Sequence, residues 1–239
     1  MTPPLARRLL AEFLGSAFLA AVVVGSGIAA QQFSHDAGLR LLENAVATAA
    51  GLFAIILMFG PVSGGHFNPV VSLVDATFGG LSRRDALAYI PAQIAGCIAG
   101  AITANGMFAL GAVSISTHHR ASPAHLFAEV VATVGLLLVI FALARTGRTT
   151  AAPAAVGAYI GAAYWFTSST SFANPAITVG RIFSDTFAGI APASAPGFVA
   201  AQLVGGLLAF ALVRFLYPGV GPSVAAEVVV ARETIGASP

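Results

Sequence analysis

Two Asn-Pro pairs carry the most distinctive chemistry in this sequence. They are Asn68-Pro69-Val70 and Asn174-Pro175-Ala176, and each opens a short apolar stretch. Because Asn is a preferred helix N-cap and Pro is favoured at the first helical position, both pairs predict the start of a helix. Side-chain amide donors at the positive end of a helix dipole would attract water or a hydroxylated solute and would oppose cations. A single pair of this kind in a loop would be an ordinary helix cap.

The two pairs lie in apolar surroundings that are unsuited to a soluble loop. In residues 63–80, two glycines precede Asn68 and about ten apolar residues follow it, which is roughly 15 Å of helix and half a bilayer. Residues 168–185 read the same way around Asn174. Irregular backbone at membrane depth is tolerated only where it is buried in protein or lines water. The segments therefore predict two half-helices that meet at their N-termini.

Composition places the whole chain in a membrane. Of the 239 residues 57% are hydrophobic and 8% are charged, and the mean hydropathy is +0.89. A soluble domain carries about 25% charged residues, and a disordered chain is more polar still, so both classes are excluded. The chain shows no basic patch, which argues against a nucleic-acid partner. Stretches free of Asp, Glu, Lys and Arg predict an all-α membrane protein with spans at 9–30, 42–61, 85–106, 125–144, 152–168 and 196–216.

The chain also repeats itself. Glu12 and Glu129 each stand at the start of an apolar helix. A Gly stands 17 residues before each motif Asn, and a Ser stands five residues before it. Gln93 and Gln202 are each the second residue of an AQ-x-x-G sequence. Each half holds three spans, so the second copy enters the membrane from the opposite side. We therefore expect a single domain over 1–239 with inverted repeats at 5–110 and 122–216 and a cytoplasmic tail at 217–239. With the N-terminus inside, the cytoplasmic side collects eight of the 11 arginines, which favours cytoplasmic termini.

These motifs resemble the aquaporin or major intrinsic protein family over essentially the whole chain. The likeness lies in AEFLGS, SGGHFNPVV, FANPAI and the paired AQ-x-x-G sequences. It implies six spans plus two re-entrant half-helices, one pore per protomer and a homotetramer. The sequence shows no nucleophile–base pair, no phosphate loop and a single Cys, so we expect no enzymatic activity, no cofactor and no metal, and we expect the protein in a bacterial inner membrane. The likeness also implies that Asn68 and Asn174 are the pore donors. Glu12 and Glu129 match buried glutamates that hold the half-helix loops by hydrogen bonds.

The sequence departs from the family pattern at two places. Val70 replaces the usual Ala of the first motif, and we expect the helix cap to survive. Ile177 occupies the position of an Arg in the outer selectivity filter. Counting from the motifs places the other filter positions at Thr48, Ala162 and Ser171, which gives a small, uncharged filter.

Two further positions belong near the predicted pore. Arg181 lies one helical turn beyond Ile177, so it predicts either a relocated cation at the outer mouth or an Arg that snorkels to the interface. His66, directly before the first half-helix, is expected in the inner vestibule. His118, His119 and His125 cluster around one loop, where solvated side chains are expected rather than a metal site, and Cys97 reads as a core residue.

Together these features predict a passive channel for small uncharged solutes, namely water, glycerol-like polyols and neutral metalloid hydroxides such as arsenite. A bacterial subgroup linked to arsenic resistance looks similar at the Ile177 position. A water-selective pore is the alternative. A coupled inverted-repeat transporter would need intramembrane charges, and the candidates are Glu12, Glu129 and Asp75. A junctional adhesion role is compatible with the GCIAG and GAYIG packing motifs, which serve contacts within one protomer equally well.

Overall fold

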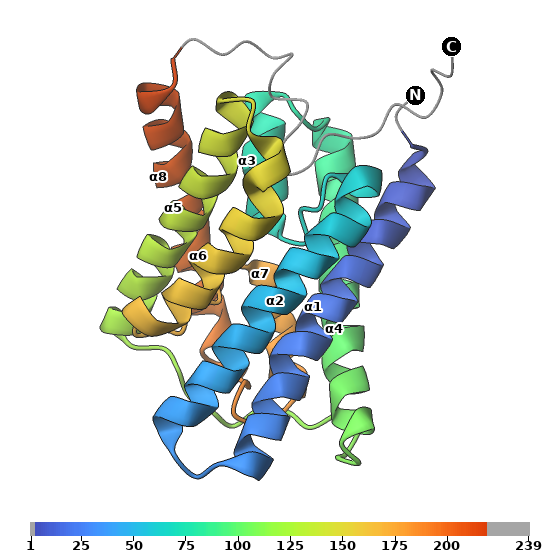
Figure 1. Ribbon diagram of the computed structural model, residues 1–239, viewed down its shortest axis with the longest axis vertical. Coiled ribbons are helices and arrows are strands. Elements are labelled where there is room, and N and C mark those ends of the chain that lie inside the picture. Colours follow the sequence, from blue (N-terminus) through green and yellow to red (C-terminus); the bar gives the residue numbers. More distant parts are fainter. Residues whose placement is uncertain (1–2, 219–239) are drawn as a thin grey trace.

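The computed structural model describes residues 3–218, and every regular element in that range is helical. The predicted tail, apart from residues 217 and 218, lies outside the described residues. Figure 1 shows the helices as a bundle in which α1 begins and α8 ends at the same end of the molecule. The elements are α1 (Leu5–Phe33), α2 (Ala37–Ser63), α3 (Pro69–Phe78), α4 (Arg83–Met107), α5 (Pro123–Arg145), α6 (Ala152–Phe166), α7 (Pro175–Gly180) and α8 (Ala195–Leu216), with 3-10 turns η1 (Thr149–Ala151) and η2 (Arg181–Phe183).

The predicted all-α membrane fold is confirmed. Within the described part of the chain, five helices are long and apolar enough to cross a membrane: α1, α2, α4, α5 and α8. Helix α6 has only 15 residues, but it continues directly from η1. Together they extend about 28 Å, close to the thickness of a hydrocarbon core. The sixth span is therefore completed by a tighter helical turn at its start.

The two half-helices begin where the Asn-Pro pairs predict. Asn68 caps α3 and accepts a hydrogen bond from Val70 N, and Asn174 caps α7 and accepts from Ala176 N and Ile177 N. The halves differ in length, because α3 has 10 residues whereas α7 has 6 and then tightens into η2. The cap on α3 is intact with Val70 in place, as expected.

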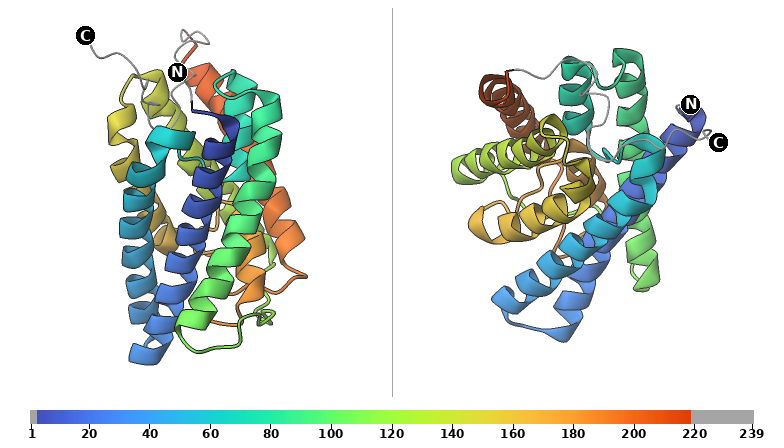
Figure 2. Two further views of the ribbon diagram at one scale, coloured as in Figure 1. Left: turned by 90° about the vertical axis from the view of Figure 1, so that its right-hand side faces the viewer. Right: turned by 45° about the horizontal axis from the view of Figure 1, so that its top comes forward.

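The two halves run in opposite directions. Figure 1 shows α1 descending from the end where the chain starts and α5 ascending towards it, and Figure 2 shows the same arrangement from two further sides. Small residues let the helices of one chain approach closely: a Cβ added at Gly96 or Gly100 would lie 2.3 or 2.0 Å from a carbonyl oxygen of α1, and one at Gly157 would lie 2.7 Å from a carbonyl oxygen of α2. The GCIAG and GAYIG motifs thus make contacts within the chain.

Candidate functional site

A narrow cavity of about 60 Å³ lies between the two halves and contains both motif asparagines. This volume exceeds the roughly 10–15 Å³ that a cavity needs to hold a water molecule. Its wall is mostly apolar and draws on both halves of the chain. The lining residues are Leu19, Val23, Thr48, Leu52, Ile56, Gly65, His66, Phe67, Asn68, Val71, Leu136, Ile140, Val156, Ile160, Tyr164, Ser171, Phe172, Asn174, Ile177 and Arg181.

Each motif asparagine is tied to the loop of the opposite half. Asn68 Nδ2 donates to the carbonyl of Ala173 at 2.8 Å, and Asn174 Nδ2 donates to the carbonyl of Phe67 at 2.8 Å. Phe67 and Ala173 both have a φ of 47°, a left-handed conformation that costs a non-glycine residue about 1–3 kcal/mol. Each amide nitrogen has two N–H donors, and among the described residues one protein acceptor is seen for each. A second donor from each side chain therefore remains for a solute in the cavity.

Buried glutamates hold both loops. Glu12 Oε1 accepts from Ser63 Oγ at 2.6 Å and His66 N at 3.1 Å, while Oε2 accepts from Phe67 N at 2.7 Å and Gln93 Nε2 at 2.7 Å. The side chain is fully buried. Four donors offset the cost of placing a carboxylate at membrane depth and commit it to the loop.

The second half repeats this arrangement. Glu129 Oε1 accepts from Phe172 N at 2.8 Å, and Oε2 accepts from Ala173 N at 2.8 Å and Gln202 Nε2 at 2.6 Å. These bonds satisfy the backbone amides directly before the Asn174 cap. Because a carboxylate with two oxygens can bind two successive amides, it fixes the loop in its strained conformation.

Three of the four predicted filter residues lie in the cavity wall, and the fourth does not. Thr48, Ser171 and Ile177 line the cavity as predicted positions should, but Ala162 is exposed on the outside of α6. The prediction of Ala162 as a filter residue is wrong. Tyr164 takes its place, and its hydroxyl lies 3.2 Å from Thr48 Oγ1. Two residues along a helix correspond to a rotation of about 200°, so the miscount turned the side chain to the opposite face.

A signal for Tyr164 is present in the sequence. The cavity-lining residues of α2 are Thr48, Leu52 and Ile56, at intervals of four. Those of α6 are Val156, Ile160 and Tyr164, also at intervals of four. Residues four apart share one helix face. Extending this stripe instead of counting from the motif would have selected Tyr164.

Arg181 lies deeper than an arginine that snorkels to the interface. It is 2% exposed and lines the cavity. Its Nε donates to the carbonyl of Ala188, and its guanidinium carbon lies 3.5 Å from the centre of the Phe172 ring. The sequence places Arg181 at the outer mouth, and the structure brings its side chain into the cavity wall.

His66 and Val70 stand on either side of the Asn68-Pro69 pair. His66 lines the cavity, with Nδ1 3.0 Å from Ser72 Oγ and Nε2 3.5 Å from Asp75 Oδ2. Val70 is 1% exposed and packs against Gly206 of α8, where an added Cβ would lie 2.6 Å from Val70 Cγ1. The larger residue of the first motif is therefore matched by the absence of a side chain on the facing helix.

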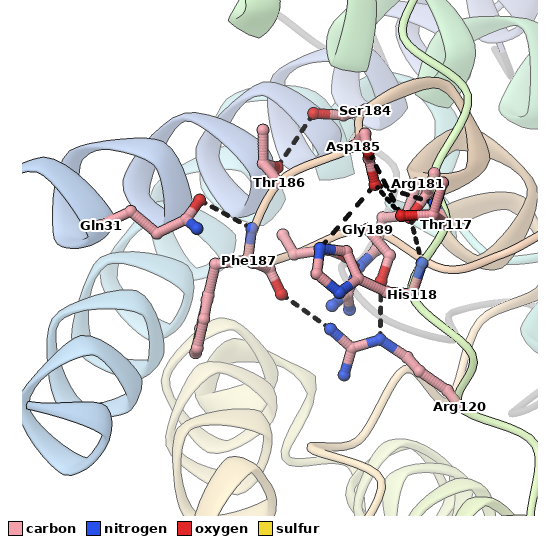
Figure 3. A network of polar contacts seen from close by, with 12 residues as sticks. Gln31, Thr117, His118, Arg120, Arg181, Ser184, Asp185, Thr186, Phe187 and Gly189 are labelled. Carbon is pink, nitrogen blue, oxygen red and sulfur yellow. Dashed lines mark hydrogen bonds and ion pairs between the residues drawn. The ribbon is translucent and has the colours of Figure 1, made fainter. Parts of the chain in front are cut away.

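The segment before α5 and the loop after η2 are joined by polar contacts. Asp185 Oδ1 accepts from Thr117 N at 2.8 Å and Thr117 Oγ1 at 3.0 Å, and it lies 3.8 Å from His118 Nε2 (Figure 3). The backbone amide of Thr117 holds the pKa of the Asp185 carboxyl below its usual value. In the described part of the chain, no three His, Cys, Asp or Glu residues are arranged to hold a metal ion.

Comparisons with known proteins agree with this geometry. The sequence profile described as major intrinsic protein matches residues 1–173. "Aquaglyceroporin AqpS" of Rhizobium meliloti (strain 1021) is 50% identical over 212 residues, which cover 89% of this chain and 91% of that protein. "Aquaporin Z" of Brucella melitensis is 31% identical over 200 residues, covering 76% and 86%. The X-ray structure of the aquaglyceroporin from Plasmodium falciparum superposes with a TM-score of 0.70 at 19% identity, covering 92% of this chain and 99% of that one.

Proposed function

Because the chain belongs to the major intrinsic protein family, we propose that it is a passive membrane channel for water and small uncharged polyols such as glycerol. Two inverted repeats form one channel domain over the whole chain. Asn68 and Asn174 are its central donors. The protein works as a homotetramer in a bacterial inner membrane, with both termini in the cytoplasm.

The observation that carries this proposal is the single cavity shared by both motifs. The capped N-termini of α3 and α7 contribute there, together with the free N–H donors of Asn68 and Asn174. A file of water or of hydroxyl groups accepts these hydrogen bonds. A cation meets the positive ends of two helix dipoles at the same point.

The outer wall favours polyols over strict water selectivity. Thr48, Tyr164 and Ser171 provide hydroxyl groups, whereas Ile177 and Ile160 provide an apolar surface. A polyol has both a hydroxylated edge and a carbon backbone, so it matches both sides of this wall. The similarity to an aquaglyceroporin at 50% identity supports the same conclusion. Neutral metalloid hydroxides such as arsenite present a comparable set of hydroxyl groups and extend the proposed solute range.

A coupled transporter has less support. Among its candidate charges, Glu12 and Glu129 are committed to hydrogen bonds that hold the loops, and Asp75 lies beside His66. A transport cycle would need these carboxylates to change partners, which would release the strained loops at the centre of the membrane.

Stopped-flow light scattering on proteoliposomes tests the proposal. Fast shrinkage in sucrose and fast reswelling in glycerol are expected for the wild type. Thr48→Phe combined with Ile177→Arg narrows the cavity wall, so glycerol entry should fall at least tenfold while water flux falls much less. Ala162→Leu is the matched control, because this position is exposed outside α6, and it should leave both fluxes unchanged. Fast water flux without glycerol entry in the wild type would favour the water-selective alternative.

A further inference from the structure

We propose that Arg181 supplies the cationic group of the outer filter although position 177 lacks it, and that Arg120 positions Arg181. The inference rests on the proposed channel function and identifies two of its specificity-determining residues. Arg120 belongs to the segment between α4 and α5, outside both half-helices. Arg181 is the first residue of η2, one turn beyond Ile177.

The repeat explains how a residue beyond the filter reaches it. Arg181 stands seven residues after Asn174, and its counterpart Asp75 stands seven after Asn68. Asp75 contacts His66, two residues before its motif, at 3.5 Å. Arg181 in the same way covers Phe172, two residues before its own motif.

The side chain at this repeat position therefore folds back towards the start of its half-helix. This direction is the ordinary one, because side chains of a helix point towards its N-terminus. Phe172 and Arg181 both line the cavity, next to Ser171. The guanidinium of Arg181 thus returns to the level of the filter loop from a backbone position farther out.

Two arginines share three successive carbonyl groups. Arg120 Nε donates to Gly189 O at 2.6 Å and its Nη2 donates to Phe187 O at 2.7 Å (Figure 3). Arg181 Nε donates to Ala188 O, which lies between them in the chain. The planar fork of Arg120 fixes the peptide groups on either side of Ala188 and so fixes the acceptor that holds Arg181.

The rest of the Arg120 environment is equally fixed. Ser194 Oγ accepts from the backbone amides of Arg120 at 3.0 Å and Ala121 at 3.1 Å. A Cβ added at Gly189 would lie 2.3 Å from Ser116 Oγ, so the clamped segment has no space to shift. The guanidinium carbon of Arg120 also lies 5.5 Å from the centre of the Phe172 ring.

The terminal nitrogens of Arg181 remain for the solute. Among the described residues, the hydrogen bond of Arg181 is made through Nε, and the side chain is 98% buried against the cavity. No Asp or Glu stands among the described lining residues, and Glu129 lies behind the wall, where it binds the backbone amide of Phe172. The donors attract hydroxyl and carbonyl oxygens, and the charge repels cations.

Urea and guanidinium test this inference, because they have nearly the same size and shape and differ in charge. Their entry rates into proteoliposomes are compared for the wild type, Arg181→Met, Arg181→Lys and Arg120→Lys. We expect Arg181→Met to raise the ratio of guanidinium to urea permeability at least tenfold, and Arg181→Lys to keep the ratio low. Arg120→Lys keeps a charge but loses the fork, so the ratio should rise several-fold because Arg181 is no longer held.

A matched control removes a charge elsewhere on the same side. Arg40 is half-buried at the start of α2 and is not among the residues that line the cavity, so Arg40→Met should leave the ratio unchanged. Urea flux with an unchanged ratio in Arg181→Met would overturn the role of Arg181. A ratio in Arg120→Lys equal to that of the wild type would overturn the positioning role of Arg120. Absence of water, glycerol and urea flux in the wild type would overturn the proposed function and this inference with it.

Discussion

The contact between Val70 and Gly206 makes the first motif depend on a helix of the other half. A Cβ added at Gly206 would lie 2.6 Å from Val70 Cγ1, whereas carbon atoms in contact are about 3.5–4.0 Å apart. Gly206→Ala therefore requires a shift of about 1 Å. Val70 is the second residue of α3 and is held by the Asn68 cap, so it has little freedom to move. We expect a loss of about 1–3 kcal/mol in the free energy of unfolding, typical of an overpacked core.

The double variant tests whether this contact is the cause. Val70→Ala alone leaves a small void, because two methyl groups are removed from a packed site. It should lower the free energy of unfolding by about 1 kcal/mol through the lost packing contacts. Combined with Gly206→Ala, the new methyl group occupies part of that void. The double variant should therefore be more stable than the sum of the two single changes by at least about 1 kcal/mol.

Thermal or denaturant unfolding of the detergent-solubilised protein measures these differences, and osmotic water flux shows whether the cap is displaced. Gly106→Ala is the control, since an added Cβ there meets no atom within 4 Å. It should change stability by less than about 1 kcal/mol, in the stabilising direction expected for Gly to Ala in a helix. Strict additivity of Val70→Ala and Gly206→Ala would refute the reasoning.

Two more outcomes follow from the described contacts. Glu129→Gln leaves one carbonyl oxygen in place of the two carboxylate oxygens, so either Phe172 N or Ala173 N loses its acceptor. We expect the free energy of unfolding to fall by about 1–3 kcal/mol and the water flux to decrease. Asp185→Asn should lower the unfolding temperature at neutral pH, because the backbone amide of Thr117 depresses the folded-state pKa of Asp185. The stability that the ionised carboxylate contributes is present above the unfolded pKa and is lost as the pH falls through the folded pKa. The difference between Asp185→Asn and wild type should shrink as the pH falls below the unfolded pKa of about 3.9, and a difference that stays constant there would contradict the role of the ionised carboxylate.

The sequence predicted what depends on local chemistry and on the repeat. The caps at Asn68 and Asn174 follow from short-range preferences. The equivalent roles of Glu12 and Glu129 in the two halves follow from their matched positions in the repeat. The contribution of α6 to the cavity wall was harder to predict, because it depends on the rotation of α6 about its axis. An error of two residues selects Ala162, on the exposed face of α6, in place of Tyr164, which lines the cavity.

Arg181 shows a different limit. Its distance from the motif is plain in the sequence, but the direction of its side chain depends on the carbonyl of Ala188 and on the Phe172 ring. The clamp that fixes this carbonyl involves Arg120, about 60 residues earlier in the chain. A contact between two loops that approach only in the folded protein leaves no periodic pattern, so the sequence gives no reason to connect these residues.

The reciprocal bonds between the motif loops also set the order of biogenesis. The carbonyl that Asn68 needs belongs to Ala173, 105 residues later in the chain. At a synthesis rate of roughly 5–20 residues per second, the first loop waits about 5–20 s before its partner leaves the ribosome. During that interval the first three spans are already inserted, yet their strained loop is held from one side only. A nascent chain released after its first half would thus lack both the partner of Asn68 and the second half of the cavity wall.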